Sequence, residues 1–189
     1  MMTLVMGGSG SGKSAWAETY AVSLSSRKKY YLATMQVTDA ESAGKAERHR
    51  RLRAGKGFVT IEQPKDIARA AGRMTDEKRE ERTALLECMS NLTANEMFSA
   101  AVPVGAKRTA EKILREIDCL RRELAHLIIV TNNVFEDGRE YEETTMEYIR
   151  ALGLVNEGLA AGADAVVEVV VGIPLFLKGG ESACICLRD

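Results

Sequence analysis

The stretch MMTLVMGGSGSGKSAWAE at residues 1–18 decides which fold this chain adopts. An apolar run of strand length, TLVM, leads into the glycine-rich segment GGSGSGKS, and a segment of helical composition follows it. Between a strand and a helix, the pattern GxxxxGK[ST] predicts a phosphate-binding loop, and it is satisfied here by Gly7, Gly12, Lys13 and Ser14. A flexible Gly/Ser loop with an incidental lysine would not explain the strand before it or the helix after it.

Each residue type in this segment suits phosphate binding. Glycines let the backbone curl so that successive N–H groups point at phosphate oxygens, and the helix N-terminus adds its partial positive charge. Lys13 would reach the outer phosphates as a catalytic cation, and the Ser14 hydroxyl is a ligand for Mg²⁺. We therefore expect a nucleotide to contact Gly7, Gly8, Ser9, Gly10, Ser11, Gly12, Lys13 and Ser14.

Length and composition favour one domain that acts on a small molecule. The 189 residues are 46% hydrophobic, enough for a substantial core, so we expect a single domain over residues 1–189. Lys and Arg total 26 against 27 Asp and Glu, and the net charge of -1 gives no reason to expect a nucleic-acid or anionic-membrane partner. The longest late apolar run, AVVEVVVGIPLFL, is shorter than the roughly 20 apolar residues of a membrane-spanning helix, and a cytoplasmic protein is expected.

The cysteines and histidines give little support to a structural metal site. The four cysteines show neither CxxC spacing nor the density of a disulfide scaffold, and the chain has two histidines. A zinc site would have few ligands to draw on, so we expect reduced cysteines that serve in packing.

Apolar runs of strand length alternate with segments of helical composition along the chain. The runs are TLVM (3–6), KYYLAT (29–34), TALLEC (83–88), HLIIVT (126–131) and AVVEVVV (165–171). Helices are expected over residues 14–23, 105–125 and 141–162. This alternation predicts an α/β fold with a mainly parallel sheet, right-handed crossovers and helices on both faces.

In such an open sheet, ligands bind beyond the carboxyl ends of the strands. We therefore expect one edge of the sheet to bring together the residues that end these strands, Gly7, Met35, Glu87 and Asn132. Glu87 closes an apolar strand, as the second acidic ligand of a phosphate-loop Mg²⁺ does, so Ser14 and Glu87 are the expected metal ligands. The alternative is that Glu87 only marks the exit of the strand into solvent, since strand ends are commonly polar.

The segment DAESAGKAERHRRLRAGKG concentrates positive charge around one histidine. Asp39 is suited to cap a helix that Gly55 ends, with Lys45, His49 and Arg53 on one helical face. One interpretation is a solvated basic helix. The other is chemical: nearby cations disfavour imidazolium, so His49 would stay neutral and nucleophilic while the arginines stabilise phosphate charge.

The second histidine has a different setting. His126 opens an apolar strand with no companion acid or nucleophile beside it in the sequence, so a structural role is expected for it.

Over nearly its whole length the chain resembles the bifunctional adenosylcobinamide kinase/adenosylcobinamide-phosphate guanylyltransferase family of cobalamin assembly. The phosphate loop alone is not specific to that family, but the ordered set of matches is. The set comprises GGSGSGKS followed by Ala17 and Glu18, YLATMQ, His49 with Arg53, Thr60-Ile61-Glu62, LLEC around Glu87, VTNNV, GLVNEGLAAGAD, and VVVGIP with Lys178.

The resemblance implies a RecA-like P-loop fold, a homotrimer, and two reactions that use ATP, GTP and Mg²⁺. The enzyme would phosphorylate adenosylcobinamide and then transfer GMP from GTP to adenosylcobinamide phosphate through a covalent guanylyl-histidine. His49 matches that histidine. Beyond the phosphate loop, the implied nucleotide contacts are Thr34, Met35, Gln36, Arg50, Arg51, Leu52, Arg53, Glu62 and Glu87.

The chain departs from the family pattern at Gly10, Asn133 and Arg150, where the family usually has Arg, Glu and Asp, and the tail from Gly179 to Asp189 has no functional interpretation. Two other classes of protein stay open. A P-loop kinase of another small molecule would use the same loop but give His49 no covalent role. A nucleotide-binding regulatory or scaffold protein would bind without turnover.

Overall fold

The computed structural model describes residues 1–24, 26–36, 43–44, 47, 50–51, 53–74, 78–133 and 141–179. Its strands are β1 (Met2–Met6), β2 (Lys28–Ala33), β3 (Phe58–Glu62), β4 (Arg82–Glu87), β5 (His126–Val130), β6 (Ala165–Val170) and β7 (Ile173–Lys178). Its α-helices are α1 (Lys13–Ser23), α3 (Met89–Phe98), α4 (Ala106–Arg121) and α5 (Glu143–Gly162), and two short 3-10 helices are η1 (Ile67–Arg73) and η2 (Arg79–Glu81). No helix of the described part is long and apolar enough to cross a membrane.

The described strands form one sheet of order β3-β2-β4-β5-β1-β6-β7. Strands β1 to β6 pair in parallel, and β7 returns antiparallel beside β6. The predicted α/β fold with a mainly parallel sheet is therefore confirmed. One strand, β5, separates the strand before the phosphate loop from the strand that ends at Glu87, as the predicted RecA-like P-loop fold requires.

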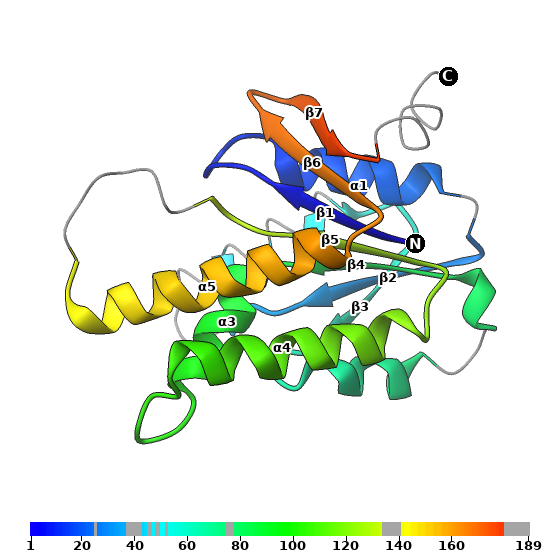
Figure 1. Ribbon diagram of the computed structural model, residues 1–189. Coiled ribbons are helices and arrows are strands. Elements are labelled where there is room, and N and C mark those ends of the chain that lie inside the picture. Colours follow the sequence, from blue (N-terminus) through cyan, green and yellow to red (C-terminus); the bar gives the residue numbers. More distant parts are fainter. Residues whose placement is uncertain are drawn as a thin grey trace.

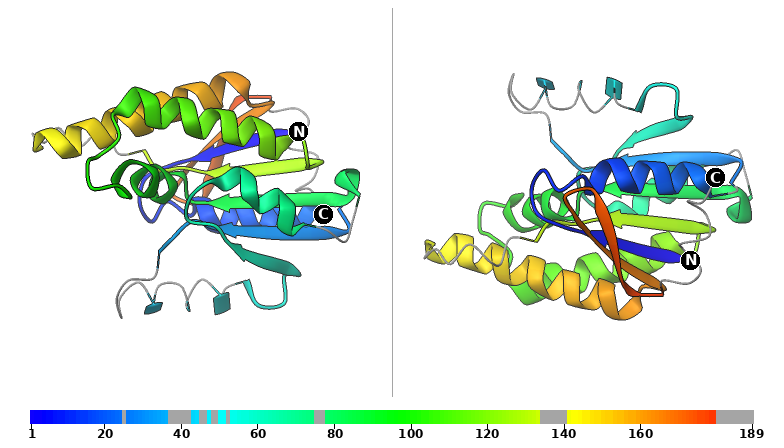
Figure 2. Two further views of the ribbon diagram at one scale, coloured as in Figure 1. Left: turned by 90° about the horizontal axis from the view of Figure 1, so that it is seen from below. Right: turned by 90° about the horizontal axis from the view of Figure 1, so that it is seen from above.

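Helices cover both faces of the sheet, α1 on one face and α3, α4 and α5 on the other (Figure 1). The two views of Figure 2 show the same layers from below and from above. Alternate side chains of each strand separate into two apolar layers, because successive residues of a strand point to opposite faces. On β2, Tyr31 packs in the layer of α1, whereas Tyr30 and Leu32 pack in the layer of α4 and α5.

The five predicted strands are present, each within a residue of its expected ends. Strands β3 and β7 and helix α3 were not predicted. Both strands lie at sheet edges and bury few residues, so their sequences lack a clear apolar alternation. Of the predicted basic helix, residues 43–44, 47, 50–51 and 53 are helical, and Asp39 and Lys45 lie outside the described residues.

Parallel pairing aligns the strand ends at one edge of the sheet. Glu87 is the register partner of Ala33 on β2 and of Val130 on β5. Beyond the strands, the Thr34 backbone N–H donates to the Glu87 carbonyl oxygen at 3.1 Å, and the Asn133 N–H donates to the Gly7 carbonyl oxygen at 3.2 Å. The segments that follow β1, β2, β4 and β5 therefore meet, as the sequence predicts.

A cluster of ion pairs fixes α3 and α4 to η1 behind this edge. The Lys112 ammonium lies 2.7 Å from Asp66 Oδ1 and 2.5 Å from Glu96 Oε2. The Glu96 side chain is only 4% exposed, and its other oxygen accepts the Asp66 backbone N–H at 2.7 Å. The hydrogen bond from Lys112 holds the pKa of the Asp66 carboxyl below its usual value.

We predict that Lys112→Met lowers the free energy of unfolding by about 2–4 kcal/mol, because a buried carboxylate loses the cation that compensates its desolvation. Urea denaturation at neutral pH measures the change. Lys107→Met is the matched control on the same helix, because Lys107 is exposed and forms no ion pair with a described residue. Equal losses in the two variants would show that the cluster does not stabilise the fold.

Candidate active site

The predicted phosphate loop joins β1 to α1, and its backbone needs glycine at two points. Gly12 has φ +90°, a left-handed conformation that disfavours side chains, and a Cβ there would lie 3.2 Å from the Gly172 Cα. A Cβ on Gly7 would lie 2.6 Å from the Val169 carbonyl oxygen. The turn between β6 and β7 therefore packs against the loop, and the Gly172 N–H donates to the Ser11 carbonyl oxygen at 2.8 Å.

Lys13 is a buried cation at the first position of α1. Its side chain donates to the Gly8 carbonyl oxygen at 3.0 Å, and Lys13 forms no ion pair with a described carboxylate. Burial lowers the pKa of Lys13, and the negative charge of Glu87 partly offsets that effect. A phosphate oxygen would be a stronger acceptor for this ammonium group than the neutral carbonyl of Gly8.

The two oxygens of the Glu87 carboxylate accept hydrogen bonds from two different elements. Ser14 on α1 donates to Oε1, and the Tyr31 hydroxyl on β2 donates to Oε2 at 3.0 Å. This contact across the sheet edge favours a role in the site over the alternative of a carboxylate that only marks a strand end. A hydroxyl and a carboxylate are the hard oxygen ligands that Mg²⁺ prefers, so Ser14 and Glu87 fit the predicted metal position.

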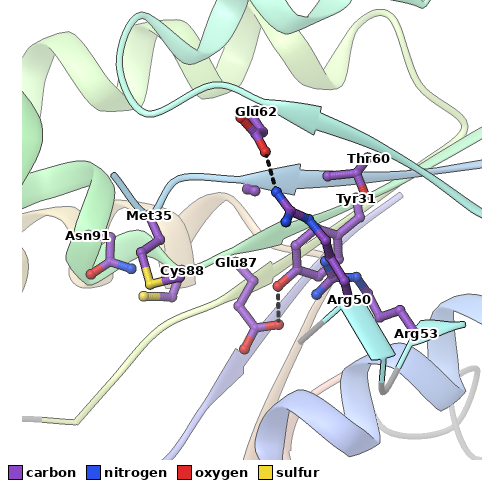
Figure 3. A pocket seen from close by; sticks show the side chains of 10 residues that line it. Tyr31, Met35, Arg50, Arg53, Thr60, Glu62, Glu87, Cys88 and Asn91 are labelled. Carbon is purple, nitrogen blue, oxygen red and sulfur yellow. Dashed lines mark hydrogen bonds and ion pairs between the residues drawn. The ribbon is translucent and has the colours of Figure 1, made fainter. Parts of the chain in front are cut away.

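A pocket opens beside Glu87, between the ends of β2, β3 and β4 and the last residues of the basic segment (Figure 3). Its volume is about 590 Å³, including the space at its open mouth. The pocket is lined by Tyr31, Ala33, Met35, Arg50, Arg53, Thr60, Glu62, Glu87, Cys88 and Asn91.

Two arginines of the basic segment reach this pocket in different ways. Arg50 is half-exposed and donates to Glu62 Oε1 at 3.0 Å. Arg53 is 7% exposed, and its Cζ lies 3.4 Å from the centroid of the Tyr31 ring. Its Nη1 is buried without a hydrogen-bond partner among the described residues. A buried, unpaired guanidinium N–H is costly, and an anionic ligand in the pocket would satisfy it.

The structure brings together five of the residues predicted to contact the nucleotide outside the phosphate loop: Met35, Arg50, Arg53, Glu62 and Glu87. Thr34, Gln36 and Arg51 do not line the pocket. Thr34 is buried and donates to the Cys88 carbonyl oxygen at 2.8 Å, whereas Gln36 is exposed. Arg51 points to Glu47, with Nε 3.4 Å from the carboxylate. His49 and Leu52 lie outside the described residues.

Sequence reasoning missed five residues of the pocket: Tyr31, Ala33, Thr60, Cys88 and Asn91. Two of them carried a signal, because Tyr31 and Ala33 lie on one side of β2, four and two residues before the predicted Met35 that follows the strand. Thr60 and Asn91 belong to β3 and α3, which were not predicted.

His126 lies far from this pocket along the strands. It is the first residue of β5, whereas the pocket lies beyond the other end of the neighbouring strand β4. Burial lowers the pKa of the His126 imidazole, and the nearby N-terminal ammonium group lowers it further.

A phosphate loop at the carboxyl edge of a parallel sheet, with a lysine, a serine and a facing carboxylate, defines the class of P-loop proteins. Residues 3–177 match the family model described as cobinamide kinase / cobinamide phosphate guanyltransferase. The chain belongs to this family, as its sequence motifs indicate, and it is an enzyme of the kinase and guanyltransferase class.

Named relatives match over nearly their whole length. The bifunctional adenosylcobalamin biosynthesis protein CobU of Escherichia coli K12 is 32% identical, and the match covers 94% of this chain and 100% of that protein. The bifunctional adenosylcobalamin biosynthesis protein CobP of Pseudomonas aeruginosa is 27% identical, covering 95% of this chain and 98% of that protein. Among solved structures, the flagellar accessory protein FlaH from Methanocaldococcus jannaschii aligns with a TM-score of 0.48 at 15% identity, covering 94% of this chain and 77% of that one.

We predict that Lys13→Ala lowers nucleotide turnover about 100- to 1,000-fold, because removal of one electrostatic contact to the transition state costs about 2.7–4 kcal/mol. Steady-state release of phosphate and pyrophosphate measures it, with Lys107→Ala as the control for loss of a lysine. Wild-type turnover in Lys13→Ala would mean that GGSGSGKS is not the working site.

Proposed function

We propose that this protein phosphorylates adenosylcobinamide with a nucleoside triphosphate and then transfers GMP from GTP to adenosylcobinamide phosphate, giving adenosylcobinamide-GDP. The observation that carries the proposal is Arg53, a buried cation with an N–H that has no partner among the described residues, in a pocket that Glu87 also lines. A pocket of this kind, connected through Glu87 to the phosphate loop, suits an anionic nucleotide better than a neutral ligand. Family membership supplies the corrinoid acceptor.

In the kinase reaction, the acceptor hydroxyl oxygen would attack the γ-phosphorus of the nucleotide in line. The new O–P bond forms as the bond to the β–γ bridging oxygen breaks, the nucleoside diphosphate leaves, and the hydroxyl proton passes to water. The Lys13 ammonium group would give up its hydrogen bond to the Gly8 carbonyl oxygen and would donate to oxygens of the outer phosphates instead. Ser14 and Glu87 would hold Mg²⁺, which when bound neutralises charge on the phosphates.

In the guanylyl transfer, a neutral imidazole nitrogen of His49 would attack the α-phosphorus of GTP. A P–N bond forms, and pyrophosphate leaves with the electron pair of the broken P–O bond. A phosphate oxygen of adenosylcobinamide phosphate then attacks the same phosphorus, and the P–N electron pair returns to His49. Arg50 and Arg53 lie one and four residues further along the chain and line the pocket, which supports placing this chemistry there.

The proposal extends to the assembly and the setting of the enzyme. We propose that residues 1–189 act as one domain, that the chain forms a closed homotrimer, and that it works in the cytoplasm on a corrinoid small molecule. Cyclic closure would shelter a nucleotide held against the basic segment near a subunit boundary.

Light scattering tests the assembly, and we predict the mass of a trimer at working concentration. A monomer mass under those conditions would contradict the homotrimer.

The covalent step is tested by incubation with GTP and Mg²⁺ followed by intact mass measurement. We predict that the wild-type chain gains one GMP, and that the adduct disappears when adenosylcobinamide phosphate is added. His49→Ala should show no adduct and no guanylyl transfer but keep cobinamide kinase activity, because in-line phosphoryl transfer needs no covalent histidine.

His126→Ala is the matched control, and it should keep the adduct and both activities. An adduct of full yield in His49→Ala, or one mapped to another residue, would contradict the role of His49. Kinase activity without any adduct in the wild-type chain would favour a P-loop kinase without a covalent intermediate.

A further inference from the structure

Tyr31 contacts two residues that belong to different parts of the site. It lies on the central part of β2 and is 3% exposed. Its hydroxyl donates to Glu87 Oε2 at 3.0 Å, and its ring lies under the guanidinium group of Arg53, 3.4 Å from Cζ. Figure 3 shows the three side chains together at the pocket. One aromatic side chain therefore connects the carboxylate facing the phosphate loop with the buried arginine of the basic segment.

The hydroxyl orients the Glu87 carboxylate. Burial raises the pKa of Tyr31 above its usual value, and the charge of Glu87 raises it further, so the phenol is a hydrogen-bond donor at neutral pH. Ser14 donates to the other oxygen of the same carboxylate. With a donor on each oxygen, the plane of the Glu87 carboxylate is fixed relative to α1.

The ring supports the Arg53 guanidinium. Tyr31 is itself supported by Phe58, whose ring meets it edge to face at a centroid distance of 6.3 Å. The chain just after Arg53 is attached to α1, because Lys56 lies 2.5 Å from the buried Glu18 carboxylate. Nη1 of Arg53, which has no partner among the described residues, thus belongs to a guanidinium group held over an aromatic ring, a contact that is stabilised by the cation–π interaction.

We propose that Tyr31 is a positioning residue that aligns Glu87 and Arg53 on one bound nucleotide, through its hydroxyl and its ring respectively. The inference rests on the proposed function in one respect, that the ligand of the pocket is a nucleotide. It goes beyond that function because Tyr31 need not touch the reacting atoms. If Tyr31 only filled the core, its replacement would lower the free energy of unfolding, and it would weaken nucleotide binding only through that loss of stability.

The test is the equilibrium affinity for GTP in Tyr31→Phe and Tyr31→Leu. It is measured by calorimetry with the α,β-methylene analogue of GTP, which cannot release pyrophosphate and therefore cannot form the GMP adduct. Tyr31→Phe keeps the ring and loses the hydroxyl, and we expect GTP to bind about 10-fold more weakly. Tyr31→Leu loses both, and we expect a further loss of about 3- to 10-fold.

Two double-mutant cycles assign these losses to the partners. In a Glu87→Ala background the hydroxyl has no carboxylate to orient, so adding Tyr31→Phe should change GTP affinity less than 2-fold. In an Arg53→Ala background the ring has no guanidinium to support. Tyr31→Leu should then weaken GTP binding no more than Tyr31→Phe does. Losses that add independently in both cycles would overturn the proposal, because residues that act through each other are not additive.

Tyr30→Phe is the matched control, because it removes a buried hydroxyl from the adjacent residue on the opposite face of β2. It should leave GTP affinity within 2-fold of wild type, and thermal unfolding of each variant separates lost binding from lost stability. Wild-type affinity in Tyr31→Phe, or an equal loss in Tyr30→Phe, would also overturn the proposal. Because the measurement requires no turnover, a missing GMP adduct in the wild-type chain would count against the guanylyl transfer and not against the role of Tyr31.

Discussion

Parallel pairing of β1 to β6 is the constraint on which the rest of this structure depends. Parallel neighbours begin at one edge of a sheet and end at the other, so every segment that follows a strand emerges on the same side. Three segments therefore meet although they are far apart in the sequence: the loop after β1, the segment after β2, and Glu87 with Cys88 at the end of β4. The same pairing requires crossover helices, which cover both faces and exclude water from the strands.

Two buried cations lie at this edge of the sheet together with the Glu87 carboxylate. Lys13 and Arg53 are both buried cations. Lys13 donates to a neutral carbonyl, and one N–H of Arg53 has no partner in the part of the chain that the structure describes. Glu87 supplies negative charge nearby but is already bonded to Ser14 and Tyr31. Desolvated cations of this kind favour a phosphate ligand, because the charge-assisted hydrogen bonds they would form are stronger than those they make now. This arrangement of cations supports the proposed nucleotide site at this edge.

Two of the departures from the family pattern have a simple structural setting. Gly10 has φ +73° and no atom within 4 Å of the position a Cβ would take, so glycine relaxes a backbone conformation that disfavours side chains and leaves open space beside the loop. Arg150 lies exposed on α5 and pairs with Glu147 one turn earlier on the same helix. Neither change disturbs the contacts among Ser14, Glu87 and Tyr31.

The sequence by itself determined the phosphate-loop motif and the parallel sheet, and it predicted roles for Glu87 and the basic segment, because these depend on local patterns: glycine spacing, apolar runs and a run of like charge. The sequence did not predict the edge strands β3 and β7 or helix α3. Contacts with neighbouring elements, and not an apolar periodicity of their own, decide which of their residues are buried. Only the tertiary structure decided that Tyr31 belongs to the site. Its side chain is one of several aromatic residues in apolar strands, and in the sequence only its even spacing before Met35 distinguishes it from Tyr30. The parallel register and the twofold alternation of the strand place Tyr30 in the apolar layer of α4 and α5, and Tyr31 in the layer of α1, where it contacts Glu87 and Arg53.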